Sequence, residues 1–467
     1  MAGIGFRLQK LLSGESYGDM VRAYLYSAII SSGPMLVVML ALWTVKISIQ
    51  SRLGSDEGAL LMSLIVYAYA FSMVLAGPFF YVVTRYLADQ YYSKRLDTFT
   101  PTYLSVLEVL LTIQSVVALI YLHFLPLSIT MKWFEYLLFL FVGGIWMGMI
   151  FLSAARNYHW IVWAFLGGGL VGIISSLVLG KFFGLSGYLG GFVLGQGTTF
   201  FILTIRIFLE FGYTHAQDFR FFLYFKKYPY LVLVGFFYYL GTWIDKFIFW
   251  FSRQGDSVLG PLRVCFNYDT PMFLAFMTIV PSMAFFLIQM ETSFIRYYRA
   301  YYQGIQHKGT LNDVRTLKEN LLENLAKNIQ KFVFFQGFLS GVLILFIYEL
   351  ARSFSLNPSQ MGIFRIGTLG AFLQMGLLIV MTFFFYFDFQ REVLVGAVGY
   401  CLGNAVLTLV TLKMGLPAYG FGFTLACFFS VLAGFLMLEQ RLKYLEYWTF
   451  MRQPIVLPQF KFETENK

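Results

Sequence analysis

The sequence is short of charged residues, and this shortage excludes a soluble globular fold. Only 12% of its 467 residues are charged and 58% are hydrophobic, whereas a soluble domain carries about 25% charged residues. A soluble fold could not cover so much apolar surface, but a lipid bilayer solvates apolar side chains directly. The composition therefore predicts a membrane protein, in which 54 Phe and 31 Tyr supply much of the apolar surface.

Reactive residues and enzyme motifs are scarce as well. The three cysteines, Cys265, Cys401 and Cys427, are widely spaced without a CxxC pair, so they predict neither a metal site nor a disulfide framework. The sequence has no GxxxxGK(S/T) loop for ATP, no DxD and no HExxH, and each of these motifs carries a specific chemistry. We therefore expect no enzyme activity, no cofactor, no metal and no ATP hydrolysis by the chain itself.

Long apolar runs fill most of the chain, and each is long enough to cross a bilayer as a helix of about 20 residues. They predict an all-α polytopic membrane protein with twelve transmembrane helices. The candidate spans are 21–45, 59–83, 103–123, 133–152, 161–180, 187–209, 229–251, 270–291, 332–351, 363–387, 392–412 and 417–438.

The basic residues predict the orientation. If both termini are cytoplasmic, 24 of the 34 Lys and Arg residues lie on the cytoplasmic side, Lys246 lies in a helix, and nine lie on the opposite side. These nine are Lys46, Arg52, Lys132, Lys181, Arg253, Arg263, Arg352, Arg365 and Lys413. Positive charge concentrates on the cytoplasmic side of membrane proteins. The net charge of +10 therefore reflects topology, and we expect no nucleic-acid partner.

An eleven-residue pattern occurs twice, almost half the chain apart. Gly184-Leu-x-x-Tyr188-x-x-Gly191 recurs as Gly415-Leu-x-x-Tyr419-x-x-Gly422, and a Phe-x-Leu follows each copy. The repeat predicts two pseudo-repeated six-helix lobes, an arrangement common in transporters whose substrate path lies between the repeats. The predicted units are an amphipathic segment 1–20, a first lobe 21–210, a cytoplasmic linker 211–228, a second lobe 229–438 and a cytoplasmic tail 439–467.

The longest polar stretch is the loop 292–331, which lies within the second lobe. It combines seven basic residues with regularly spaced leucines, which predicts a basic amphipathic helix on the cytoplasmic face. The loop serves either as a solvated connector that sets topology or as a docking surface for a cytoplasmic partner, and we favour the connector because basic cytoplasmic loops are usual.

Two charged neighbours, Asp245 and Lys246, lie inside a predicted span. Ionisable side chains are costly in a membrane and commonly mark a transport path, although a structural ion-pair network that locks the second lobe is an equally weighted alternative. Adjacent residues point about 100° apart on a helix, so we expect each to face another helix or a wet cavity and not to pair with the other.

Four further residues extend the candidate transport path. Arg263, Tyr268 and Asp269 lie in the following polar loop. This loop either lines an exit for a polar substrate or is an ordinary hairpin, and we slightly favour the lining role because it directly follows the Asp245–Lys246 helix. Glu291 ends the next span. Pro34, Pro78 and Pro281 lie inside spans, where proline removes a backbone hydrogen bond and kinks the helix. Such kinks mark bending points in transporters but occur in static membrane proteins too.

Several ordered motifs are spread over nearly the whole chain. They are Met1-Ala-Gly-Ile-Gly-Phe6, Ser31-Ser-Gly-Pro34, Thr84-Arg85-Tyr-Leu-Ala-Asp89, Leu240 to Trp250, Gly260-Pro-Leu-Arg263, Tyr268 to Pro281, Glu291-Thr292 and Leu445 to Met451. Together these motifs resemble the PelG family of exopolysaccharide transporters.

This resemblance implies a flippase-like member of the multidrug/oligosaccharidyl-lipid/polysaccharide superfamily in the bacterial inner membrane. It implies export of Pel, a cationic, partly deacetylated N-acetylhexosamine polymer, beside a cytoplasmic glycosyltransferase, PelF, and the membrane proteins PelD and PelE. It carries over no catalytic residue. Because an ATPase motif is missing, polymer synthesis itself could drive export. The alternatives are a lipid-linked oligosaccharide or small-molecule flippase, a membrane-embedded transferase, and a non-transporting scaffold of a synthase complex.

Overall fold

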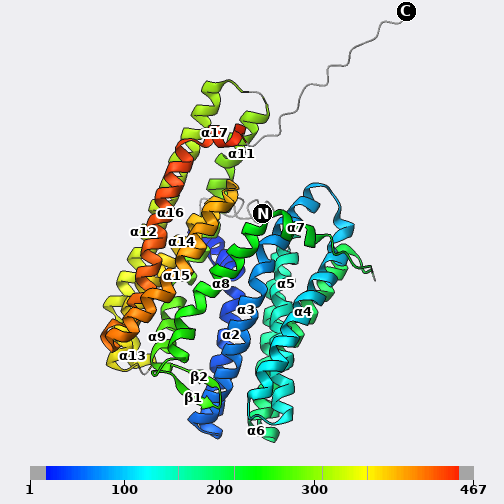
Figure 1. Ribbon diagram of the computed structural model, residues 1–467, viewed down its shortest axis with the longest axis vertical. Coiled ribbons are helices and arrows are strands. Elements are labelled where there is room, and N and C mark those ends of the chain that lie inside the picture. The colour runs from blue at the N-terminus through cyan, green and yellow to red at the C-terminus, as the bar shows by residue number, and fades with distance from the viewer. Residues whose placement is uncertain (1–16, 156, 215, 308, 355, 452–467) are drawn as a thin grey trace, which may run out of the picture.

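The computed structural model describes residues 17–451 except for 156, 215, 308 and 355, and this part of the chain is almost entirely helical (Figure 1). Eleven helical stretches are long and apolar enough to cross a membrane. One of them, α6 (Tyr158–Phe211), is two helices joined at a kink, so the described chain holds twelve crossings. The predicted all-α polytopic fold is confirmed.

The elements of the first half and the connector are α2 (Tyr17–Arg52), α3 (Ser55–Tyr92), η1 (Leu96–Thr98), α4 (Phe99–Phe124), α5 (Ile129–Ala154), α6 and α7 (Phe221–Lys227). The second half comprises α8 (Pro229–Trp250), β1 (Asp256–Leu259), β2 (Leu262–Val264), α9 (Phe266–Met277), α10 (Val280–Gln289), the π-helical turn η2 (Met290–Phe294), α11 (Ile295–Gln306), α12 (Leu311–Leu345), α13 (Ile347–Phe354), α14 (Pro358–Tyr386), α15 (Gln390–Met414), η3 (Leu416–Ala418), α16 (Phe421–Lys443) and α17 (Leu445–Met451). The two strands form one antiparallel hairpin.

The kink in α6 turns the chain back on itself. Gly184 adopts a positive φ of 58°, which side chains other than glycine rarely tolerate. The two arms then lie so close that the Ser176 hydroxyl donates to the Tyr188 carbonyl at 3.1 Å, and a Cβ on Gly195 would lie 2.5 Å from the Gly172 Cα. Small residues along the arms therefore allow the fifth and sixth crossings to pack as a tight antiparallel pair.

The second copy of the repeated pattern makes the same turn between α15 and α16. Gly415 has a φ of 93°, and a Cβ on Gly422 would lie 2.6 Å from the Thr408 backbone. The two copies thus occupy the turns between crossings five and six and between eleven and twelve. This supports two equivalent lobes, called here the N-lobe (α2–α6) and the C-lobe (α8–α16).

The lobes meet through their first two crossings: α3 packs on α8, and α2 packs on α10. The α3–α8 contact is closest at Gly77 and Gly235, where a Cβ on Gly235 would lie 1.9 Å from the Gly77 carbonyl oxygen. Figure 1 shows α7, α11 and α17 at one end of the molecule, and β1, β2 and α13 at the other. We call these the α7–α11 end and the hairpin end.

Large apolar side chains on the outer helix faces are exposed, as lipid-facing residues are. Phe182 is 75% exposed and Phe338 68%, while many polar side chains, such as Gln336 and Asn404, are fully buried. In a bilayer the outer face is solvated by lipid and polar groups pair inside the bundle.

Two predicted regions differ in detail. The loop 292–331 is not one helix: α11 ends at Gln306, and Thr310 caps a new helix, α12, which continues without interruption into the ninth crossing. Pro281 lies in the first turn of α10, just after the break that follows α9, while Pro34 and Pro78 lie inside continuous helices. Most of the predicted amphipathic segment 1–20 and the end of the tail lie outside the described residues.

Candidate functional site: a buried polar network in the C-lobe

Asp245 and Lys246 form an ion pair inside the C-lobe. Asp245 is fully buried and Lys246 is 8% exposed, and the lysine Nζ lies 3.0 and 2.9 Å from the two carboxylate oxygens. The expectation that these neighbours would not pair was wrong. Their side chains leave the helix in different directions, but the four methylenes of lysine let its ammonium fold back, where it also donates to the Thr242 carbonyl at 3.2 Å.

Asp245 also joins three helices, as the sequence led us to expect for a buried charge. The Tyr268 hydroxyl of α9 donates to its Oδ2 at 2.8 Å, and the Asn404 amide of α15 donates to its Oδ1 at 3.4 Å. Asn404 is held in place because the same amide donates to the Gly241 carbonyl at 2.9 Å and its oxygen accepts from Thr408 at 3.0 Å.

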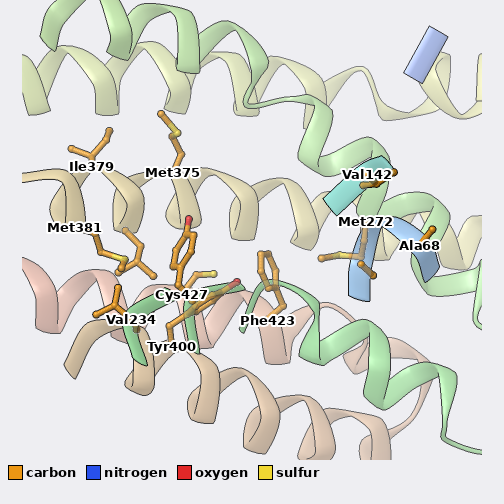
Figure 2. Close-up of a cluster of buried hydrophobic side chains, with 14 of the residues drawn as sticks. Ala68, Val142, Val234, Met272, Met375, Ile379, Met381, Tyr400, Phe423 and Cys427 are labelled. Carbon is orange, nitrogen blue, oxygen red and sulfur yellow. The ribbon is translucent and has the colours of Figure 1, made fainter. Parts of the chain in front are cut away.

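Lys246 is enclosed by aromatic rings. Its Nζ lies 4.8 Å from the centroid of Phe276 and 5.4 Å from that of Phe423, distances at which a ring face attracts a cation. Figure 2 shows Phe423 near Tyr400 and Cys427 in the buried cluster of this lobe. Tyr400 extends the polar network because its hydroxyl accepts from the Gln374 amide at 3.2 Å.

Asp269 closes the network toward the hairpin end. Its Oδ2 accepts from the Trp250 indole at 2.7 Å and from the Cys265 backbone amide at 3.1 Å. Its Oδ1 is buried without a hydrogen-bond partner. Asp245, Lys246, Tyr268 and Asp269 are thus brought together, and they leave one carboxylate oxygen unsatisfied.

Arg263 has a different surrounding. Its guanidinium donates to the carbonyls of Trp250 at 2.9 Å and Ser252 at 3.0 Å, and also to that of Gly255. These carbonyls belong to the end of α8 and the turn after it, where helical partners run out. The contacts favour a role in fixing the β-hairpin onto α8 over a role in lining a path.

Glu291 lies away from the other candidates. It is 2% exposed, in the π-helical turn η2 that leads into α11, so it stands toward the α7–α11 end while Asp269 stands toward the hairpin end. A π-helical turn inserted between two α-helices frequently occurs at functional sites.

Tyr67 of α3 connects the N-lobe to this site at the hairpin end. Its hydroxyl donates to the Arg263 carbonyl at 2.6 Å, and its ring stacks on Trp250 with centroids 4.6 Å apart. One turn further along, Phe71 stacks on Phe247 at 4.9 Å. We call the contact of Tyr67 with Arg263 and Trp250 the Tyr67 latch.

The lobes also touch at the α7–α11 end. Tyr81 stacks on Phe385 with centroids 4.7 Å apart, and Arg85 lies 3.6 Å from Asp388 and 3.6 Å from Asp89. Arg85 and Asp388 are 39% and 50% exposed. Ion pairs this open to water contribute little stability. We therefore expect the Tyr81–Phe385 contact and the crossing of α3 and α8 to hold the lobes together at this end.

Sequence reasoning missed Asn404, Gln374 and Thr408 in the C-lobe. Each is a polar residue within a predicted span, so a search for uncharged polar residues in the spans, and not for charges alone, would have found them. That search would not have shown which of them meet Asp245, because their helices are distant in sequence.

Comparison with known proteins agrees with the architecture. The PelG family, described as "Putative exopolysaccharide Exporter (EPS-E)", matches residues 1–450. No curated protein matches the sequence.

Solved structures of similar fold are transporters of the MOP superfamily. An outward-facing multidrug resistance MATE family transporter has 14% identity and a TM-score of 0.64, with 96% of this chain and 99% of that chain covered. An inward-facing one has 11% identity and a TM-score of 0.63, with 90% and 99% covered. A MOP superfamily transporter from Pyrococcus furiosus, whose binding pocket is described as having reversed polarity, has 13% identity and a TM-score of 0.61, with 91% and 96% covered.

Family and fold are therefore those of membrane transporters and not of enzymes. Because the match extends from the first residue through both lobes and the buried network of the second, the chain belongs to the PelG family of exopolysaccharide exporters.

Proposed function

We propose that this chain exports Pel, a cationic, partly deacetylated N-acetylhexosamine polymer, from the cytoplasm across the bacterial inner membrane. The observation that carries the proposal is the match of one exporter family to residues 1–450. In this proposal both termini are cytoplasmic, so the α7–α11 end faces the cytoplasm and the hairpin end faces outward. The polymer passes between the lobes, and its synthesis supplies the drive.

The Asp245–Lys246 network acts in this proposal as the switch of the C-lobe. A polycation approaching the network would attract the carboxylates of Asp245 and Asp269 and repel Lys246. The contacts of Asp245 with α9 and α15 would then change together, because a charge buried among fixed partners cannot shift alone. The pair could instead only lock the lobe, and the test must separate these roles.

A secretion assay tests the proposal. A strain that lacks its own copy is complemented with the wild-type chain, with Asp245→Asn, or with the control Glu349→Gln, whose carboxylate is exposed on α13. We expect at least a tenfold loss of secreted polymer with Asp245→Asn, equal amounts of chain in the membrane, and normal secretion with the control. Normal secretion by Asp245→Asn would remove the network from the transport path.

Hydrolysis of the secreted polymer tests the substrate. The proposal predicts both N-acetylated and free-amine hexosamines in the hydrolysate. A lipid-linked oligosaccharide flippase is the second candidate, favoured by the fold that this chain shares with multidrug transporters. It would instead leave a lipid-linked intermediate on the cytoplasmic leaflet when the chain is deleted.

The partners PelF, PelD and PelE remain part of the proposal. Their cytoplasmic contact is assigned to the basic face of α11 and α12, where Arg299 and Arg315 are exposed, while Lys318 is already held by Glu446 at 2.6 Å. Arg299→Glu with Arg315→Glu should reduce co-purification of PelF severalfold. If co-purification is unchanged, this loop is only a connector. If Asp245→Ala exports normally while deletion of the chain disperses the partners, the chain is a scaffold.

A further inference from the structure

A half-open pocket with a cavity volume of about 100 Å³ lies in the N-lobe, outside the polar network of the C-lobe. It is bounded by α3, α4 and α5, and most of its lining is apolar. Three lining residues carry oxygen atoms on their side chains: Tyr67, Tyr121 and Glu135.

Glu135 is the unusual member of this lining. It is 5% exposed, and its Oε2 is buried without a hydrogen-bond partner. The Tyr121 hydroxyl is also buried without a partner. An unpaired carboxylate in an apolar surrounding is among the costliest groups to bury, and it persists where it serves a function. Asp245 in the other lobe, by contrast, has three partners.

The cavity adjoins the Tyr67 latch. The ring of Tyr67 forms part of the cavity wall. It stacks on Tyr121 with ring centroids 5.9 Å apart and, more closely, on Trp250 of the C-lobe with ring centroids 4.6 Å apart. One side chain therefore touches both the surroundings of Glu135 and the contact that joins the two lobes at the hairpin end.

The dimensions decide what this cavity can hold. Sites for sugars and other drug-sized ligands have volumes of roughly 300–1,000 Å³, so a hexosamine unit does not fit. A few water molecules do fit, since each needs only about 10–15 Å³ of such space. A metal cation would need a shell of several oxygens, and the lining offers few besides this carboxyl.

We propose that Glu135 is a proton-binding site and that loss of its proton opens the Tyr67 latch. With the proton bound, the carboxyl is neutral, the cavity stays nearly dry and Tyr67 stays against Trp250 and Arg263. When the proton leaves to water, the carboxylate draws water into the cavity. The hydrated cavity expands between α3 and α4 and displaces Tyr67 from its contacts.

The ionisable groups around Glu135 fit this assignment. Tyr67 faces it from α3 and Tyr121 from α4, and both are neutral over the ordinary pH range. Lys132 lies three residues earlier on α5, and across the latch the guanidinium of Arg263 is engaged with backbone carbonyls. Glu135 lies six residues into α5, about 9 Å from its start at the hairpin end, so protons exchange with that side.

Two measurements on the purified full-length chain in lipid nanodiscs test this inference. The first is the infrared band of protonated carboxylic acids, followed as the pH is raised. We expect one band to disappear on titration, to be absent in Glu135→Gln and to remain in the exposed control Glu349→Gln. The second is a distance distribution between spin labels at Thr130→Cys and Ser353→Cys, exposed sites on the N-lobe and C-lobe at the hairpin end. The three native cysteines are buried and stay in place.

The distance should lengthen as the pH is raised in the wild-type background and stay short at every pH in Glu135→Gln. Tyr67→Ala should give the long distance at every pH, which shows that the labels report the latch. A wild-type distance that does not change with pH overturns the inference even if Glu135→Gln fails to fold. A distance that responds to sodium but not to potassium at fixed pH would also overturn it, because the site would then hold a metal cation. Neither readout depends on the identity of the exported polymer.

Discussion

The two lobes share one helical frame, but their buried polar groups differ. In the C-lobe, Asp245 is paired with Lys246 and bonded by Tyr268 and Asn404. In the N-lobe, Glu135 has a buried oxygen without a partner, and the amide of Gln114 has none at either atom. The buried charge of Asp245 is therefore paired in the C-lobe, where the unsatisfied carboxylate oxygen is the neighbouring Asp269 Oδ1. Glu135 of the N-lobe, by contrast, has an unsatisfied oxygen and, among the described residues, no charged partner beside it that could replace a proton or water.

This difference suggests to us distinct roles for the two repeated lobes. The repeated pattern places a glycine with positive φ at both turns, 58° at Gly184 and 93° at Gly415. The buried polar side chains differ between the lobes, and we infer that the lobes perform different tasks. Four tests address this comparison.

The largest effect is expected from Lys246→Met. It leaves the carboxylate of Asp245 buried without its counter-charge, which costs on the order of 3–5 kcal/mol in buried pairs. The melting temperature in detergent should fall by many degrees. The matched control is Lys327→Met, which breaks an exposed pair whose lysine side chain is 62% exposed. Equal stability of the two variants would show that the C-lobe network is not a lock.

A second variant tests the frame that both lobes share. In Gly235→Ala the new Cβ would lie 1.9 Å from the backbone oxygen of Gly77, so α3 and α8 must separate, at a cost of about 1–3 kcal/mol. Gly337→Ala is the control, since no atom lies within 4 Å of its added Cβ. We expect reduced stability and export from the first and neither from the second. Normal behaviour of Gly235→Ala would mean that the crossing is loose.

The third test exchanges one buried amide in each lobe for an apolar residue of similar size. Asn404→Leu removes the bonds to Asp245 and Gly241 and should cost about 1–3 kcal/mol. Gln114→Met removes an amide whose two polar atoms lack partners, so it should be neutral or stabilising. The melting temperature of Asn404→Leu should fall, and that of Gln114→Met should stay the same or rise. A fall of the same size in both would contradict the contrast between the lobes.

The smallest effect is expected at the α7–α11 end. Arg85→Gln breaks an exposed contact with Asp388, and such contacts contribute about 0–1 kcal/mol. We expect a melting temperature within a degree or two of wild type. A large loss of stability would show that this ion pair, and not the Tyr81–Phe385 stack, holds the lobes together there.

The fold could be predicted closely because each transmembrane helix is determined by a local run of apolar residues. Every predicted span is largely helical, since about 20 apolar residues have no other stable form in a bilayer. The spans 270–291 and 332–351 are each interrupted, at 278–279 and at 346. The repeated glycines at 184 and 415 fixed the equivalence of the halves. The helical form of loop 292–331 was predicted, but its division into two helices at Thr310 was not.

The site was harder to predict because the residues that contact one another in it are distant in sequence. Asp245 could be singled out as a buried charge, but its partner Asn404 lies 159 residues away, and periodicity does not reveal such contacts. Pairing with Lys246 was wrongly excluded, because a helix-direction argument ignores the length of the lysine side chain. Glu135 was overlooked because it lies near the start of a span, where a charge looks interfacial.

We propose that the charges of the C-lobe serve export and not folding alone. The double variant Asp245→Asn/Lys246→Met removes both charges together, so no lone charge is buried, and its stability should recover relative to Lys246→Met. Secreted polymer should then be measured at matched membrane levels of the chain. We expect a stable chain that still secretes at least tenfold less polymer than wild type. Full secretion by the double variant would contradict this proposal and assign the pair to structure alone.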